Sequence, residues 1–221
     1  MKNRLILGDG LLGSELVKQT GWDYISRKKD MMDLNDMVYF IKDVERYDEI
    51  INCIAHTDTY DENKDSHWNV NYKFVADLVD ACSDKKLIHI STDYVYSGSE
   101  ENANEYDIPV HNRTWYGYTK LLSDSYVQLR SNNYLLVRCG HKEYPFKYEK
   151  AFTDIKGNFD YVDKIASLII NLIKDDASGI KNVGTELKSM YALAKKSNSN
   201  VGKMKCNNEL MPKDVSMRID K

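Results

Sequence analysis

The sequence lacks any long apolar run and has few of the residues that mark a secreted protein. None of its apolar stretches approaches the ~20 residues needed to cross a bilayer, and its start, Met1-Lys2-Asn3, is not the apolar core of a signal peptide. The four cysteines, Cys53, Cys82, Cys139 and Cys206, form no C-x-x-C pair, and three of them lie in apolar segments. We therefore expect a cytoplasmic protein whose thiols are reduced core residues.

The sequence also has little that suggests a metal, a nucleic acid or a membrane as a partner. Its five histidines show no ligand spacing, so we expect no protein-built metal site. Lys and Arg number 31 against 34 Asp and Glu, a net charge of −3, which favours neither nucleic acid nor an anionic membrane. The three prolines, and the absence of repeats and low-complexity linkers, indicate one sizeable core, or one domain with a small appendage.

A glycine-rich segment follows the first predicted strand. Residues 4–7 are expected to form a short buried strand, which leads into Gly8-Asp9-Gly10-Leu11-Leu12-Gly13 and then into residues with helical apolar spacing. In this setting G-x-G-x-x-G is typical of a dinucleotide-binding turn, where backbone N–H groups and the positive helix end hold a pyrophosphate. A plain strand–turn–helix joint is the alternative.

A second predicted strand, residues 22–26, ends in a basic residue. A basic residue at this place accommodates the 2′-phosphate of NADP, whereas an acidic one bonds the ribose of NAD. Arg27 therefore favours NADPH. Asp30 lies close enough in the sequence to keep NADH possible, and a solvated basic turn would give the same pattern.

Strands and helices alternate along the chain. The expected strands cover 49–55, 87–91 and 134–139, and the expected helices cover 33–46, 66–82 and 116–129. This alternation predicts an α/β fold, a Rossmann-like doubly wound parallel sheet. We expect residues 1–140 to form the NAD(P)-binding domain. Residues 141–221 would form a small C-terminal appendage on the substrate side, partly packed back on that domain, with helices near 161–173 and 187–196 and a strand near 179–184.

The helix near residue 116 begins with the segment Tyr116-Gly117-Tyr118-Thr119-Lys120. Positions four apart share a helix face, so the Tyr116 phenol and the Lys120 ammonium are expected to be neighbours. A nearby cation stabilises a phenolate and moves the phenol pKa from ~10 toward a value useful for proton transfer. The spacing alone is weak evidence, and its weight depends on the nucleotide-binding opening before it.

Together these motifs resemble the extended short-chain dehydrogenase/reductases, and within them the dTDP-4-dehydrorhamnose reductase branch. The resemblance covers about residues 1–140 and implies a Rossmann fold, NADPH or NADH, and a nucleotide-linked 4-keto-6-deoxyhexose as substrate. The motifs occur in family order: Gly8-x-Gly10-x-x-Gly13, Ile25-Ser26-Arg27 leading to Asp33-Leu34-Asn35-Asp36, Asn52-Cys53-Ile54-Ala55-His56-Thr57 with Asp61, Asn71, Ser91-Thr92-Asp93-Tyr94-Val95-Tyr96, and Tyr116-x-x-x-Lys120.

The resemblance also implies roles for particular residues. Thr92, Tyr116 and Lys120 match the family's catalytic threonine, tyrosine and lysine: Tyr116 would protonate the reduced carbonyl oxygen, Thr92 would hydrogen-bond it, and Lys120 would hold the nicotinamide ribose and keep the Tyr116 pKa low. The cofactor-binding positions would be Gly8, Gly10, Leu11, Leu12, Gly13, Arg27, Asp33, Leu34, Ala55, Thr57 and Lys120.

Three features of the sequence bear on the choice among relatives. Asp93-Tyr94 stands where sugar-nucleotide dehydratases commonly carry Asp-Glu, so 4-keto reduction is favoured first and 4-epimerisation second. Met211 precedes Pro212 where the family usually has an arginine, which removes a phosphate contact. The portion after residue 140 is also shorter than usual.

The shortening allows two interpretations. The chain is a trimmed enzyme, with a smaller sugar site that a second copy in a homodimer could complete. Alternatively, it is a non-catalytic NADP-binding subunit of a partner enzyme, similar to the regulatory beta subunit of methionine adenosyltransferase. The complete set of Thr92, Tyr116 and Lys120 favours the enzyme.

Overall fold

A parallel sheet of six strands lies at the centre of the computed structural model, which describes residues 2–99, 101–107 and 113–219. Pro109 and His111 lie outside these ranges. The strand order is β10-β5-β4-β3-β1-β2, and all neighbouring strands are parallel, which confirms the predicted α/β fold. The strands are β1 Arg4–Leu7, β2 Asp23–Ile25, β3 Glu49–Asn52, β4 Lys86–Ile90, β5 Tyr134–Cys139 and β10 Gly179–Val183.

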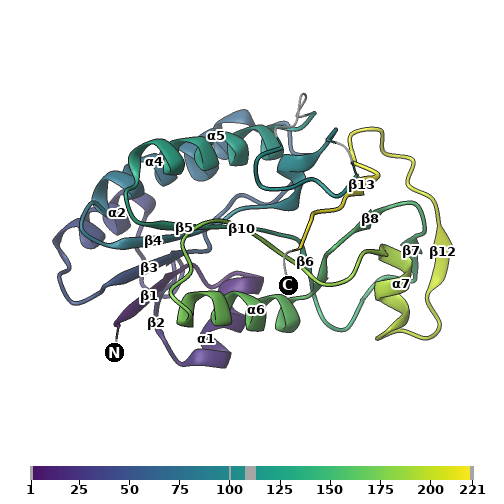
Figure 1. Ribbon diagram of the computed structural model, residues 1–221, viewed down its shortest axis with the longest axis horizontal. Helices are drawn as coiled ribbons and strands as arrows, with labels where there is room; N and C mark the ends of the chain where they lie inside the picture. The colour runs from purple at the N-terminus through teal and green to yellow at the C-terminus, as the bar shows by residue number, and fades with distance from the viewer. Residues whose placement is uncertain (1, 100, 108–112, 220–221) are drawn as a thin grey trace.

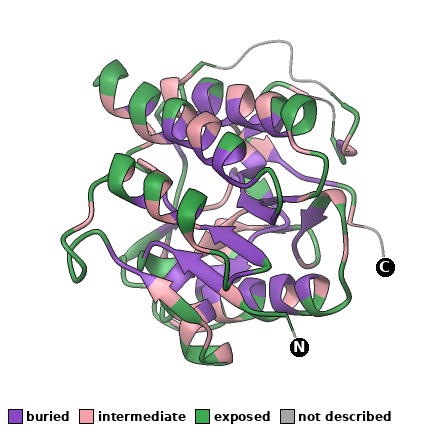
Figure 2. Cartoon of the chain, turned by 90° about the vertical axis from the view of Figure 1, so that its left-hand side faces the viewer, coloured by how far each residue is buried: buried purple, intermediate pink, exposed green. Residues whose placement is uncertain are grey.

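Helices cover both faces of this sheet. In Figure 1, α2 (Leu34–Asp43), α4 (Phe74–Ala81) and α5 (Trp115–Arg130) lie above the sheet, and α1 (Leu11–Thr20) and α6 (Val162–Lys174) lie below it. The four central strands, β1, β3, β4 and β5, are almost wholly buried (Figure 2), because each of their faces packs against a helix layer. No helix among the described residues is both long enough and apolar enough to span a bilayer.

The sheet contains a switch point between β1 and β3. The chain leaves β1 toward β2 on one side, and β3 then pairs with β1 on the other. Ligands of open α/β sheets bind outside the carboxyl ends of the strands at such a point. The Gly8 to Gly13 loop and the residues that follow β3 meet there, since a Cβ on Gly8 would lie 2.8 Å from the Ile54 side chain.

The N-terminus of α2 forms as its sequence predicts. Asp33 caps the helix: its carboxylate accepts the Asp36 N–H at 2.9 Å, and the Asp36 carboxylate accepts the Asp33 N–H at 3.2 Å. The helix ends at Asp43, earlier than the predicted end near residue 46. Val44, the next residue, has an extended backbone (φ −83°, ψ 110°), and Asn3 binds the Arg46 carbonyl at 3.0 Å.

The helix predicted over residues 66–82 is divided in three. α3 (Lys64–His67) and α4 are joined by the π-helical turn η1 (Trp68–Lys73). η1 turns Asn71 into the interior, where its amide binds both the N–H and the carbonyl of His56 at 2.8 and 3.0 Å. The wider turn therefore clamps the segment that follows β3.

Residues after 140 complete the central sheet and its helix layer: β10 pairs with β5, and α6 packs beside α1. The remaining residues form a small lobe, on the right in Figure 1. It holds two small sheets of strand order β11-β8-β13 and β12-β7. The other elements are the 3-10 turn η2 Asp93–Tyr96, β6 His141–Lys142, β7 Lys150–Phe152, β8 Lys156–Gly157, β9 Asp160–Tyr161, β11 Lys188–Ser189, α7 Met190–Lys195, β12 Gly202–Met204 and β13 Asp214–Val215.

A pair of glycine substitutions tests the packing of the first loop. A Cβ on Gly13 would lie 2.0 Å from the Gly8 carbonyl oxygen, whereas a Cβ on Gly10 would meet nothing within 4 Å. We expect Gly13→Ala to lower the free energy of unfolding by about 1–3 kcal/mol, and Gly10→Ala to change it by less than about 0.5 kcal/mol. Urea unfolding of the two variants measures this. Equal stabilities would contradict the close contact between Gly13 and Gly8.

Candidate active site

The loop between β1 and α1 has the geometry of a phosphate-binding turn. Gly8 has a positive φ of 96°, and the contact between Gly13 and Gly8 permits no side chain at residue 13. Gly10 is the N-cap of α1, yet no side chain caps the first N–H groups of this helix, and its first turn holds no acidic residue. These N–H groups and the open space beside Gly10 fit a pyrophosphate.

At the end of β2, two charged neighbours of Arg27 have partners of their own. The Asp30 carboxylate accepts the Ser26 N–H at 2.8 Å and so closes the turn, and Lys29 binds the Tyr24 hydroxyl at 3.1 Å. Arg27 is exposed and has no hydrogen-bond or ion-pair partner in the described parts of the chain. Its guanidinium is therefore available to an anionic ligand. Asp30, the acidic residue that kept NADH possible in the sequence, is bonded to the backbone of the turn.

The other predicted cofactor residues surround the same sheet edge. Asp33 is occupied as the cap of α2, and Leu34, at the start of that helix, is half-buried. Ala55 is half-buried and Thr57 exposed, both just beyond the carboxyl end of β3. Leu12 is buried in the core beneath the sheet, and Leu11 is exposed at the helix start, so of these two only Leu11 offers its side chain to a ligand.

Thr92 and Tyr116 meet above the carboxyl end of β4. Thr92 caps η2: its hydroxyl accepts the Tyr94 N–H and donates to the Asp93 carboxylate, both at 3.2 Å. Burial raises the pKa of Tyr116, and a hydrogen bond with Thr92 opposes this rise. Tyr116 thus keeps its proton at neutral pH, which is the state that a proton donor requires.

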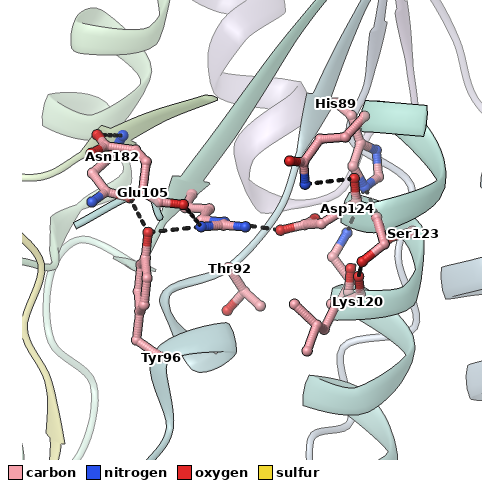
Figure 3. Close-up of polar contacts among 12 residues, drawn as sticks. His89, Thr92, Tyr96, Glu105, Lys120, Ser123, Asp124 and Asn182 are labelled. Carbon is pink, nitrogen blue, oxygen red and sulfur yellow. Dashed lines mark hydrogen bonds and ion pairs between the residues drawn. The ribbon is translucent and has the colours of Figure 1, made fainter. Parts of the chain in front are cut away.

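Lys120 lies deeper than its spacing from Tyr116 predicted. Its ammonium donates to the Ile90 carbonyl at 2.8 Å and lies 3.2 Å from Nε2 of His89, and Figure 3 shows it beside Ser123 and His89. No hydrogen bond joins it to Tyr116 among the residues that the structure describes. The carbonyl at the end of β4 is a better acceptor than a neutral phenol. Burial lowers the pKa of Lys120 to about 8.

Aromatic side chains that the sequence did not single out surround Tyr116. The Tyr94 ring lies edge-on to the Tyr116 ring, with centroids 5.9 Å apart, and the Tyr60 and Tyr94 hydroxyls are 3.1 Å apart. His67 approaches Tyr116 from α3, with ring centroids 6.4 Å apart. These rings make the surroundings of the Tyr116 phenol apolar, which is the cause of its raised pKa.

Three side chains of metal-ligating type lie close together next to the aromatic residues around Tyr116. Their spacing in the sequence did not indicate this cluster. One ligand atom from each of His56, Asp61 and His67 lies within 4.8 Å of the others. Hydrogen bonds account for the cluster: His56 Nε2 lies 3.0 Å from Asp61 Oδ2, and His67 contacts the Asp61 carbonyl at 3.2 Å and Asn71 at 3.3 Å. The cluster therefore holds the loop after β3 against α3.

A buried polar network fixes α5 to the sheet (Figure 3). Arg138 of β5 donates to the Asp124 carboxylate of α5 at 3.0 Å, to the Tyr96 hydroxyl at 2.9 Å and to the Glu105 carbonyl at 3.1 Å. The Tyr96 hydroxyl in turn donates to Asn182 of β10 at 2.8 Å. The network joins the helix of Tyr116 to the turn that follows Thr92.

A pocket of about 710 Å³ lies between Tyr94 and the C-terminal lobe, and we call it the lobe pocket. Asp93, which hydrogen-bonds Thr92, and Tyr94, whose ring meets that of Tyr116, both line it, so the pocket lies next to the Thr92–Tyr116 pair. Its wall is mainly apolar and includes Phe146, Tyr148, Phe152, Phe159, Met204 and Met211. Met211 thus lines the space next to the predicted catalytic residues, as an apolar side chain.

A family model described as the RmlD substrate binding domain matches residues 2–142, more than half of the chain. The chain belongs to this family. Its fold is that of the dTDP-4-dehydrorhamnose reductase-like extended short-chain dehydrogenase/reductases, so the resemblance seen in the sequence is confirmed. Members of this group are NAD(P)-dependent reductases of sugar nucleotides.

Relatives of this RmlD-family chain include the spore coat polysaccharide biosynthesis protein SpsK of Bacillus subtilis (strain 168). It is 28% identical over 138 residues, which make up 58% of this chain and 49% of SpsK. The chain thus spans about half the length of this curated relative.

Solved structures of dTDP-4-dehydrorhamnose reductases are similar over a longer stretch. The protein from Bacillus anthracis strain Ames, in complex with NADP, has a TM-score of 0.82 and 23% identity, covering 100% of this chain and 92% of that one. A hypothetical dTDP-4-dehydrorhamnose reductase from Sulfolobus tokodaii has a TM-score of 0.82 and 26% identity, covering 98% and 92%.

The buried ammonium of Lys120 predicts a pH dependence of stability. Its pKa is about 8 in the folded chain against 10.5 for an ordinary lysine, so between these pH values the unfolded chain binds the extra proton. Stability should therefore rise with pH in this range, by up to about 1.4 kcal/mol per unit. Urea unfolding of the parent and of Lys120→Met at successive pH values isolates this contribution. A difference between the two that does not change with pH would contradict it.

Proposed function

We propose that this protein reduces the 4-keto group of a nucleotide-linked 4-keto-6-deoxyhexose, of the dTDP- or UDP-4-dehydrorhamnose type, and that NADPH is the reductant. The observation that carries the proposal is the meeting of Thr92 and the protonated Tyr116 at the sheet edge where the phosphate-binding loop lies. A module that only binds nucleotide has no chemical need for this pair. Membership of the RmlD family supports the same substrate class.

The phosphate groups of the cofactor would be held by groups that the fold leaves without other partners. The first turn of α1 and Gly10 would bind the pyrophosphate, and Arg27 would bind the 2′-phosphate of NADPH. Ala55, Thr57 and Lys120 would line the nicotinamide half. When bound, NADPH supplies the hydride that reduces the sugar C4. The crystallised relative from Bacillus anthracis is in complex with NADP, which agrees with this choice.

The residues of the chain supply the proton and hold the charge. As the carbonyl at C4 is reduced, negative charge develops on its oxygen. The Tyr116 hydroxyl gives that oxygen a proton, so that an alcohol forms and a phenolate remains on Tyr116. The Thr92 hydroxyl hydrogen-bonds the same oxygen. The apolar rings around Tyr116 exclude water, which strengthens both interactions.

Removing the phenol hydroxyl tests the proton transfer. We expect Tyr116→Phe to lower turnover by about 10²- to 10⁴-fold, the usual contribution of a general acid, and to leave NADPH affinity nearly unchanged. Turnover is followed by NADPH absorbance with dTDP- and UDP-4-keto-6-deoxyglucose. Tyr118→Phe, an exposed tyrosine of the same helix, is the control and should retain full activity. Equal activity of the two variants would refute the role of Tyr116.

The same assay distinguishes the enzyme from a regulatory subunit. Tight NADPH binding by the parent protein without turnover of either keto sugar would indicate a non-catalytic subunit. Exchange of the C4 configuration without net NADPH consumption would indicate an epimerase.

The charge on Arg27 should set the choice of cofactor. A hydrogen-bonded pair with a charged group contributes about 1.5–3 kcal/mol, so we expect Arg27→Ser to weaken NADPH binding by roughly ten- to a hundredfold. NADH affinity should change little. Fluorescence titration of both cofactors measures this, with Lys28→Ser, an exposed neighbour, as the control. An equal loss for NADPH and NADH would exclude Arg27 from recognition of the 2′-phosphate.

A further inference from the structure

Lys142 directs an ammonium group into the lobe pocket. It lies in β6, whose backbone pairs with β9 at Lys142 and Tyr161, so the position of its main chain is fixed. Its Nζ lies 5.9 Å from the centre of the Phe159 ring, and both side chains line the pocket. Burial lowers the pKa of Lys142, and the negative charge of Asp93 opposes this change.

This ammonium has no acceptor of its own. No hydrogen bond or ion pair within 4 Å reaches it from any residue that the structure describes. Asp93 acts on it only electrostatically and makes no hydrogen bond or ion pair with it; the Asp93 Oδ1 accepts instead from Thr92. A partly buried charge without a partner is unfavourable for the fold. Such a charge is expected where a ligand supplies the missing acceptor.

We propose that Lys142 binds an oxyanion of the substrate in the lobe pocket and so determines substrate specificity. The proposal rests on the proposed function, because it takes the pocket beside Thr92 and Tyr116 as the substrate site. Apolar walls strengthen an ammonium–oxyanion pair, since little water screens it. Lys150, on β7, also lines the pocket, but it is exposed and thus contributes less.

Two sources can supply the oxyanion. One is the diphosphate of the nucleotide. The other is a carboxylate on the sugar, which would place the substrate among the nucleotide-linked uronic acids instead of the 6-deoxyhexoses proposed above. Asp93 hydrogen-bonds Thr92 and packs against Gly140, which precedes Lys142 by two residues. Lys142 is therefore close to the residues proposed to act on the sugar. Both oxyanions accept hydrogen bonds from an ammonium in the same way, so the ligand series below separates them.

The test measures binding rather than turnover. Calorimetric titrations of UDP, dTDP, UDP-glucose and UDP-glucuronate, with NADP⁺ present, are compared for the parent and for Lys142→Met. Loss of a charge-assisted hydrogen bond should weaken binding by about ten- to a hundredfold. A loss for all four ligands assigns Lys142 to the diphosphate. A loss confined to UDP-glucuronate assigns it to a sugar carboxylate.

Two further variants and a stability measurement complete the test. Lys142→Arg keeps the charge and should recover most of the affinity, and Lys150→Met should reduce it by less than about threefold. Lys142→Met should melt at the same or a higher temperature than the parent, because it removes an unpaired charge. A lower melting temperature, with a loss of binding that Lys142→Arg does not restore, would make Lys142 structural and overturn the proposal.

Two outcomes separate this proposal from the proposed function. Unchanged binding by Lys142→Met, in a protein that reduces the keto sugars, would reject the role of Lys142 alone. Equal losses in Lys142→Met and Lys150→Met would also reject it, because they would reflect the general charge of the pocket. If the parent binds none of the four ligands, the proposed substrate class fails and this proposal fails with it.

Discussion

The buried ion pair between Arg138 and Asp124 is the interaction on which the geometry of the candidate site depends. Both side chains are at most 5% exposed, and Asp124 lies eight residues after Tyr116 in the same helix. Removing one partner of such a pair lowers the free energy of unfolding by about 3–5 kcal/mol, because the other charge is left buried without a partner. Through Tyr96 the arginine also holds the turn after Thr92. The Arg138 guanidinium thus fixes the positions of both segments, the one with Thr92 and the one with Tyr116, relative to β5.

Exclusion of water gives the residues around this pair their chemical character. It keeps the Tyr116 phenol protonated, lowers the pKa of Lys120 to about 8 and raises the pKa of the Asp93 carboxyl. The three shifts have one leading cause, the loss of hydration, and each favours the neutral form of its group. Bound cofactor and substrate would bring charges into this dry space. The protein groups that face such charges are therefore expected to change their protonation together.

Features set by neighbouring residues could be predicted from the sequence. The cap at Asp33, the turn from Gly8 to Gly13 and the bounds of β5 all follow from local chemistry, and the structure agrees with each. Features set by distant contacts could not. The approach of His67 to Tyr116, the inward turn of Lys120 to Ile90 and the unpaired state of Lys142 depend on segments dozens of residues apart. The one local feature that could have indicated a ligand-binding role for Lys142 is its position just beyond the carboxyl end of β5.

The π-helical turn has a consequence for how this part of the chain can vary. η1 adds one residue between α3 and α4, so the two helices are out of phase: His67 faces the ring of Tyr116, while Phe74 and Leu78 pack on the sheet. Rewinding Trp68–Lys73 as a regular α-helix with the same number of residues would rotate one end relative to the other by about 100°. Either the contact with Tyr116 or the packing on the sheet would then be lost. The wider turn thus lets this segment hold one residue more than a regular helix while both contacts are kept.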